Sequence, residues 1–145
     1  MSLVSIRSAI KAKLDARKLA GILGEVYDGE QDQQRMDIAS YPVAEIRRAP
    51  TEGSFFFFLE DQIEYQFDVL LYAEMDNQGS ALAEKSLDAV IDDLLYQFAN
   101  DRTLGGICDG AVWPGLTRSG MIEWRGKSHY VSVLTLRCRK IQDNG

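Results

Sequence analysis

Histidine and cysteine are scarce in this chain, and their scarcity limits the chemistry that it can perform. The 145 residues include one histidine, His129, and two cysteines, Cys108 and Cys138. Two cysteines this far apart do not resemble the framework of a secreted disulfide-rich domain or a metal knuckle. We therefore expect both thiols to be buried and free, because unpaired cysteine behaves as a small hydrophobe.

Long apolar runs are also missing. Segments such as Phe55 to Leu59 are soon interrupted by charge, whereas a membrane-spanning helix needs roughly 20 apolar residues. The start of the chain has neither the long apolar stretch nor the small-residue cleavage site of a secretory signal. The sequence predicts a protein that folds in a cytoplasm and does not enter a membrane.

Positive charge is in deficit. The formal net charge of −6 opposes general nucleic-acid binding, which depends on neutralising phosphates with lysine and arginine. The deficit is uneven, because residues 1–20 carry five cations and one carboxylate, a charge of +4 that leaves −10 for the remainder. Such asymmetry favours head-to-tail contact between copies.

What the chain does contain is the apolar content of one globular domain over residues 1–145, with 46% hydrophobic and 26% charged residues. Apolar residues from Leu3 to Leu14 recur at helical spacing and predict a helix that stops near Gly21 or Gly24. Ser80 could cap a second, longer helix that ends near Asn100. Its apolar stripe consists of Ala83, Leu87, Val90, Ile91, Leu94 and Phe98.

Strand signals fill the rest of the chain. The clearest is 63–74, where apolar and polar residues alternate, which predicts one core face and one mostly wet face. Shorter strands are predicted at Val26–Tyr27 and 41–48. Ile107 to Thr117 is predicted as a strand broken by Pro114 and Gly115, Gly120 to Gly126 as a hairpin region, and 128–141 as a final strand. We expect an α+β fold, with an antiparallel or mixed β-sheet and the N-terminal and long central helices packed on one face.

Side chains that could perform catalysis are sparse. His129 lies inside the last predicted strand, so a dyad would need Cys108 or a serine to meet it through folding alone. Gly105-Gly106 follows a helix, which is the wrong order for a phosphate loop and is better explained by a turn with positive φ. We expect neither enzymatic activity nor a cofactor.

Two further groups of side chains have competing interpretations. Glu84, Asp88 and Asp92 repeat every four residues along the second helix, where they could bind a divalent cation, face a basic partner or simply be solvated. Trp113 and Trp124 flank a predicted turn and could stack on a ligand, although cross-strand packing is the commoner role of such aromatics.

One pattern begins with the segment Tyr65-Gln66-Phe67-Asp68-Val69-Leu70-Leu71-Tyr72, continues with the amphipathic helix after it and ends with Asp101-Arg102-Thr103-Leu104-Gly105-Gly106. This pattern resembles the tail terminator (tail completion) family of long-tailed bacteriophages. The closing strand Tyr130-Val131-Ser132-Val133-Leu134-Thr135-Leu136-Arg137 fits the resemblance, which covers roughly residues 63–139. Residues 24–61 match nothing in that pattern.

The resemblance implies a structural protein of the virion, assembled in the host cytoplasm and placed at the head-proximal end of the tail. It implies a homohexameric ring that binds the last ring of the tail tube protein, halts its polymerisation and then presents a surface to the head-tail connector protein. DNA would pass through the lumen without specific binding. Acidic walls would suit that passage because they repel phosphate, and our candidates are Glu84, Asp88 and Asp92.

For the ring contacts we expect an exposed aromatic patch and the basic face of the first helix, since such patches mark protein interfaces. The candidate residues are Phe55, Phe56, Phe57, Phe58, Arg7, Lys11 and Lys18. Replacing Phe56 and Phe58 with serine should then abolish ring assembly without unfolding the monomer.

Two other functions remain open from the sequence. The chain could be a different neck component, such as a head-closure or head-tail joining protein. It could instead be an α+β domain that binds a small ligand, with a pocket lined by Trp113, Trp124 and His129.

Overall fold

The computed structural model describes residues 3–28, 41–48, 56–59, 62–75, 80–108, 112–124 and 126–141. In chain order these contain α1 (Leu3–Leu19), β1 (Glu25–Asp28), β2 (Val43–Arg48), β3 (Phe56–Leu59), β4 (Gln62–Glu74), α2 (Ser80–Ala99), β5 (Val112–Trp124) and β6 (Lys127–Ile141). Both predicted helices and the strands around 26–27, 41–48, 63–74 and 128–141 are present at nearly the predicted bounds. Neither described helix is both long and apolar enough to cross a bilayer.

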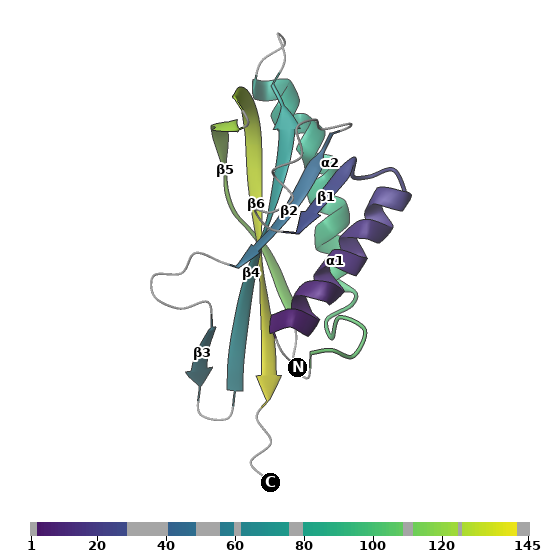
Figure 1. Cartoon of the computed structure of the whole chain (residues 1–145), viewed down its shortest axis with the longest axis vertical. Helices are drawn as coiled ribbons and strands as arrows, with labels where there is room; N and C mark the ends of the chain where they lie inside the picture. Colours follow the sequence, from purple (N-terminus) through teal and green to yellow (C-terminus); the bar gives the residue numbers. More distant parts are fainter. Residues whose placement is uncertain are drawn as a thin grey trace.

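The strands form one mixed sheet in the order β1-β2-β4-β6-β5, with β3 also paired to β4 (Figure 1). β1 and β2 are parallel, and the other pairs are antiparallel. The central pair is β4 with β6, in unbroken register from Gln62 opposite Ile141 to Glu74 opposite His129. The predicted α+β class and single mixed sheet are therefore confirmed.

Both helices pack on the same face of this sheet, as predicted. Ile6, Ile10 and Leu14 of α1 are fully buried in a core cluster that also contains the apolar stripe of α2. The sheet contributes alternate residues of β4 and β6 to this cluster, namely Phe67, Val69, Leu71, Ala73, Leu134, Leu136 and Cys138. We call this side the helix face and the opposite side the helix-free face.

Ion pairs join α1 to its surroundings. Lys13 Nζ lies 2.9 Å from Asp101 Oδ2 and Arg17 Nε lies 3.3 Å from Asp93 Oδ2, so two cations of α1 lie against acids of α2 and of the segment that follows it. Arg7 Nε donates to Asp28 Oδ1 of β1 at 2.6 Å. The positive charge of the first 20 residues is thus matched largely by carboxylates of the same chain.

The helix-free face is not mostly wet, which corrects the prediction for 63–74. Leu70 and Tyr72 of β4 lie on this face and are only 8% and 1% exposed. They pack in a second apolar cluster with Val131 and Val133 of β6. Two large apolar side chains in the polar register of β4 were the sequence signal of this second buried surface.

The strand predicted at 107–117 is also placed wrongly. β5 begins at Val112 and runs through Pro114 and Gly115 to Trp124, with one irregularity between Leu116 and Arg118. The hairpin expected at 120–126 is present, because Trp124 at the end of β5 pairs with Lys127 at the start of the antiparallel β6. Proline is tolerated in an edge strand because its missing N–H would face away from the neighbouring strand. β5 lies at one end of the strand order and has β6 as its one neighbour among the described strands.

Candidate functional site

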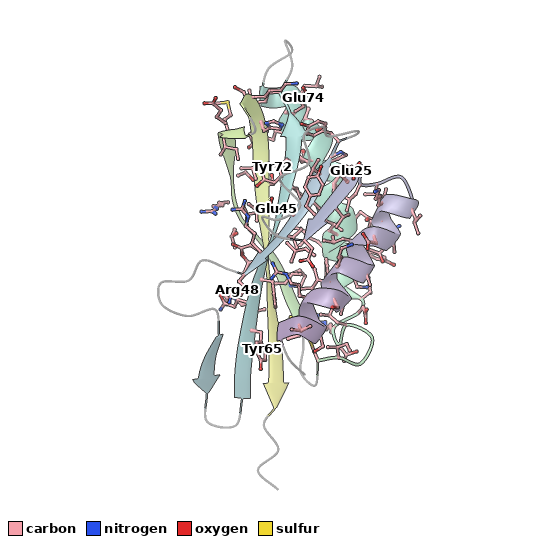
Figure 2. The ribbon with its side chains drawn as sticks, in the orientation of Figure 1. Glu25, Glu45, Arg48, Tyr65, Tyr72 and Glu74 are labelled. Carbon is pink, nitrogen blue, oxygen red and sulfur yellow. The ribbon has the colours of Figure 1, made fainter. Side chains whose placement is uncertain are left out.

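A buried carboxylate lies on the helix-free face, on the strand next to β1. Glu45 of β2 has no exposed surface, and it forms an ion pair with Arg47, two residues along the same strand. The Tyr72 hydroxyl donates to Glu45 Oε1 at 3.5 Å, and Figure 2 shows Tyr72 and Glu45 on neighbouring strands. Burial, followed by the Glu45 carboxylate, raises the pKa of Tyr72 above its ordinary value of 10. Tyr72 therefore remains a neutral hydrogen-bond donor at any ordinary pH.

A second buried carboxylate on this face is satisfied by hydroxyl groups. Thr135 of β6 donates to Asp68 Oδ1 at 2.7 Å, and Asp68 is 5% exposed. The Thr135 and Thr117 hydroxyl oxygens lie 3.2 Å apart, and Thr117 donates to the backbone carbonyl of Val133 at 3.1 Å. Glu45 and Asp68 each have a partner inside the chain, so neither is available as an unpaired catalytic base.

A β-bulge at Thr117 changes which side chains of β5 reach the helix-free face. Leu116 is opposite Leu134, a residue of the helix face, and Arg118 is opposite Val133, a residue of the helix-free face. In a regular strand Leu116 and Arg118 would point to the same side, but the extra residue turns Arg118 to the other side. Arg118 is close enough to Tyr72 to act on its ionisation electrostatically.

Arg118 borders a pocket of about 530 Å³ on the helix-free face. Its floor and walls come from four strands and comprise Arg47, Leu70, Tyr72, Arg118, Ser119, Gly120, Ile122, Val131 and Val133. The ligand-binding interpretation placed Trp113, Trp124 and His129 around a pocket, and His129 is not among the described residues that line this one. The side chains of Trp113 and Trp124 lie outside what the structure describes.

His129 is held in the sheet by hydrogen bonds and is 1% exposed. Its Nε2 lies 2.8 Å from the Tyr41 hydroxyl, and its Nδ1 lies 3.0 Å from the Lys127 carbonyl oxygen. The Tyr72 ring meets the imidazole edge-on, with centroids 6.4 Å apart. Cys108 and Cys138 are buried in the helix-face core without a disulfide, on the opposite side of the sheet from His129, so neither is placed to form a dyad with it.

The segment Asp101 to Gly106, which carries part of the family resemblance, forms a compact loop after α2. Leu104, Gly105 and Gly106 have φ values of 49°, 69° and 95°, which confirms the predicted positive-φ turn. The Gly105 N–H donates to Asp101 Oδ1 at 2.9 Å, and the Cys108 N–H donates to the Thr103 carbonyl at 2.8 Å. The loop turns Leu104, 4% exposed, into the core.

Asp101 gives this loop a predicted pH dependence. The Gly105 N–H, and after it Lys13, lower the pKa of Asp101 below its ordinary 3.8. A carboxylate whose pKa is lower in the folded state stabilises the fold at pH values above its unfolded-state pKa. This stabilisation disappears as the pH falls through the folded-state pKa. We expect Asp101→Asn to lower the unfolding free energy at pH 7 by less than about 1 kcal/mol, since the carboxylate is partly exposed. Chemical denaturation should show that the stability difference between the original chain and Asp101→Asn shrinks below about pH 4. A stability difference that does not change with pH would contradict the prediction.

Three of the predicted ring contacts are cations of α1, and each has a carboxylate partner. Arg7 pairs with Asp28, Lys11 with Asp15 at 2.9 Å and Lys18 with Glu25 at 3.4 Å. The Lys11 and Lys18 side chains are still 37% and 47% exposed, so they can also meet another copy. Their role in a ring stays a prediction.

The aromatic part of the predicted interface is only partly described. Phe55 lies outside the described residues. The backbone of Phe56, Phe57 and Phe58 belongs to β3, which pairs with the start of β4 in the register of Phe56 opposite Tyr65. The side chains of these residues are outside the described part, and their interface role stays a prediction.

The carboxylates of Glu84, Asp88 and Asp92 lie along the exposed side of α2. Within the described residues no group of three or more histidine, cysteine or acidic side chains is arranged to hold a metal ion. The cation interpretation of this row therefore has no geometric support. Solvation and a lumen-facing role are both compatible with its exposure.

Comparison with protein-family models and with curated proteins finds no match to this chain in either case. The family resemblance therefore rests on the residues quoted above and on the order of the elements. The bulge and the pocket beside it were not predicted, because nothing in the residue types around Thr117 marks the extra residue. Arg118 could be linked to the pocket only once the strand register was known.

Proposed function

We propose that this chain is a structural subunit of a long-tailed phage virion, a tail terminator that assembles as a homohexameric ring on the last ring of the tail tube. The ring halts tube polymerisation and offers its other surface to the head-tail connector. The function is geometric and involves no catalysis. DNA passes through the lumen, and the exposed Glu84, Asp88 and Asp92 are the residues that we assign to its acidic wall.

The observation that supports this proposal best is the long edge strand β5. Among its 13 residues, Leu116, Met121 and Ile122 are 50%, 64% and 37% exposed. A long edge strand with exposed apolar side chains is a ready site for pairing with another chain. An assembling subunit has a use for such a surface, whereas a monomeric protein usually protects it.

The two ends of the strand order suggest how such pairing could close a ring. One end is the 13-residue β5 and the other is the 4-residue β1, against which α1 packs. Contact of β5 with itself would give a twofold dimer, whereas contact of β5 with a different surface of the next copy is heterologous and closes into a ring at a suitable rotation. If such a ring binds the tube end through one face, and its other face does not match another ring of tube protein, tube growth ends there.

The test is the solution mass by light scattering across a dilution series, together with electron microscopy of the assembled species and of isolated tail tubes mixed with the protein. We expect six copies around a central hole, on its own or at the tube end. A twofold dimer, or a monomer that leaves tube ends bare, would refute the proposal. Co-sedimentation with isolated heads instead of tails would indicate a different neck component.

A further inference from the structure

The pocket on the helix-free face has an apolar floor. Leu70 and Tyr72 of β4 and Val131 and Val133 of β6 form it, and these side chains belong to the second apolar cluster. Its volume of about 530 Å³ lies within the range of small-molecule sites, which is about 300–1,000 Å³. The floor can bury the body of an aliphatic or aromatic molecule.

The space above the floor depends on a glycine. Gly120 of β5 lines the pocket opposite Val131, and a Cβ added there would meet no atom within 4 Å. Its φ is not in the left-handed region, so a side chain would enter empty space without backbone strain. Gly115 also has open space around its Cβ position and faces the same side, opposite Thr135, but it does not line the pocket.

The charged residues that line the pocket are both arginines, in a chain whose net charge is −6. Arg47 neutralises the buried Glu45. Arg118, which the bulge turns toward this side, is exposed and forms no ion pair with a described residue. The carboxylate of Asp68 on the same face is buried and accepts the Thr135 hydroxyl. The charge that a ligand meets at the rim is therefore positive.

We propose that this pocket binds a small organic anion, a carboxylate attached to an aliphatic or aromatic body. The body lies on Leu70, Tyr72, Val131 and Val133 in the space left by Gly120, and the carboxylate is held by Arg118, with Arg47 on the opposite wall. Guanidinium groups recognise carboxylates through paired charge-assisted hydrogen bonds. The proposal does not rest on the proposed ring, although β5 contributes side chains both to the pocket and to the exposed edge.

The test is a titration with 4-phenylbutyrate and its neutral analogue 4-phenylbutyramide, which differ in the charge of one end, followed by calorimetry and by amide chemical shifts. We expect the acid to bind at least about tenfold more tightly, which corresponds to about 1.4 kcal/mol. Shift changes should concentrate on Leu70, Gly120, Val131 and Val133. Equal binding of acid and amide, or no binding of either, would overturn the proposal.

Matched variants locate the site. Gly120→Val should abolish acid binding and Gly115→Val should leave it unchanged, because both add the same strand-compatible side chain and only one fills the pocket. Arg118→Gln should weaken acid binding about tenfold and leave amide binding unaltered, with Arg118→Lys in between. If Gly120→Val and Gly115→Val bind the acid equally, the pocket is not the site.

The carboxylate could also belong to a protein segment, and a second probe separates this case. Acetyl-Ala-Ala-Phe presents an aromatic group and a free carboxylate at the end of a peptide. Weaker binding of this peptide than of 4-phenylbutyrate supports the small-anion site. Binding at least about tenfold tighter, with the same loss in Gly120→Val, would overturn it in favour of a partner's chain terminus.

Discussion

Replacing Arg47 with alanine is expected to lower the free energy of unfolding by about 3 kcal/mol, because it leaves the fully buried Glu45 carboxylate without its cation. Removing one partner of a buried pair typically costs about 3–5 kcal/mol. We take the lower end because the Arg47 side chain is 37% exposed, so water can partly replace it. Urea denaturation at pH 7, with the midpoint and slope fitted separately, measures the loss.

The double variant Arg47→Ala with Glu45→Gln tests whether the uncompensated carboxylate causes this loss. Glutamine carries no charge, so burying it without a cation costs less than burying the Glu45 carboxylate without Arg47. We expect the double variant to be more stable than Arg47→Ala in the same urea denaturation. Equal stability of the two variants would contradict the explanation.

A matched control lies next to Arg47 on the same strand. Arg48 is exposed, and alanine at this position should change the unfolding free energy by no more than about 0.5 kcal/mol. Equal effects of Arg47→Ala and Arg48→Ala would mean that the ion pair with Glu45 adds nothing beyond an ordinary surface charge.

The sequence predicted the elements well where one periodicity dominated. The stripe from Ala83 to Phe98 identified α2 and its buried side, and the alternation in 63–74 identified β4 and the residues that it turns toward the helices. These predictions succeed because burial on one face imposes a repeat of 3.6 or 2 residues on the apolar positions.

The opposite face of the sheet was predicted poorly because its burial depends on residues far apart in the sequence. Glu45 is a charged residue of the predicted strand 41–48, and it is buried where β2 pairs with β4 and Tyr72 approaches it. The bulge at Thr117 is a property of the pairing of β5 with β6, so the direction of Arg118 is not encoded in any local pattern.

If β5 is the ring contact, charging its exposed edge should abolish assembly. Leu116→Lys combined with Met121→Lys should convert the assembled species into monomers in light scattering. Both side chains are at least half exposed, so lysine costs little in the folded monomer, whereas charges on an edge strand oppose pairing with another chain. The monomer should unfold at nearly the same denaturant concentration as the original chain.

The control must charge equally exposed residues elsewhere. Leu82 and Tyr96 on α2 are 47% and 66% exposed, close to the 50% of Leu116 and the 64% of Met121. Leu82→Lys combined with Tyr96→Lys therefore adds the same charge at equally exposed positions without touching β5. We expect this double variant to assemble normally. Loss of assembly in both variants would indicate a general effect of charge, and normal assembly of the Leu116 and Met121 double variant would exclude β5 as the contact. In that case the aromatic strand β3 would become the first candidate, and Phe56→Ser with Phe58→Ser would decide it by the same mass measurement.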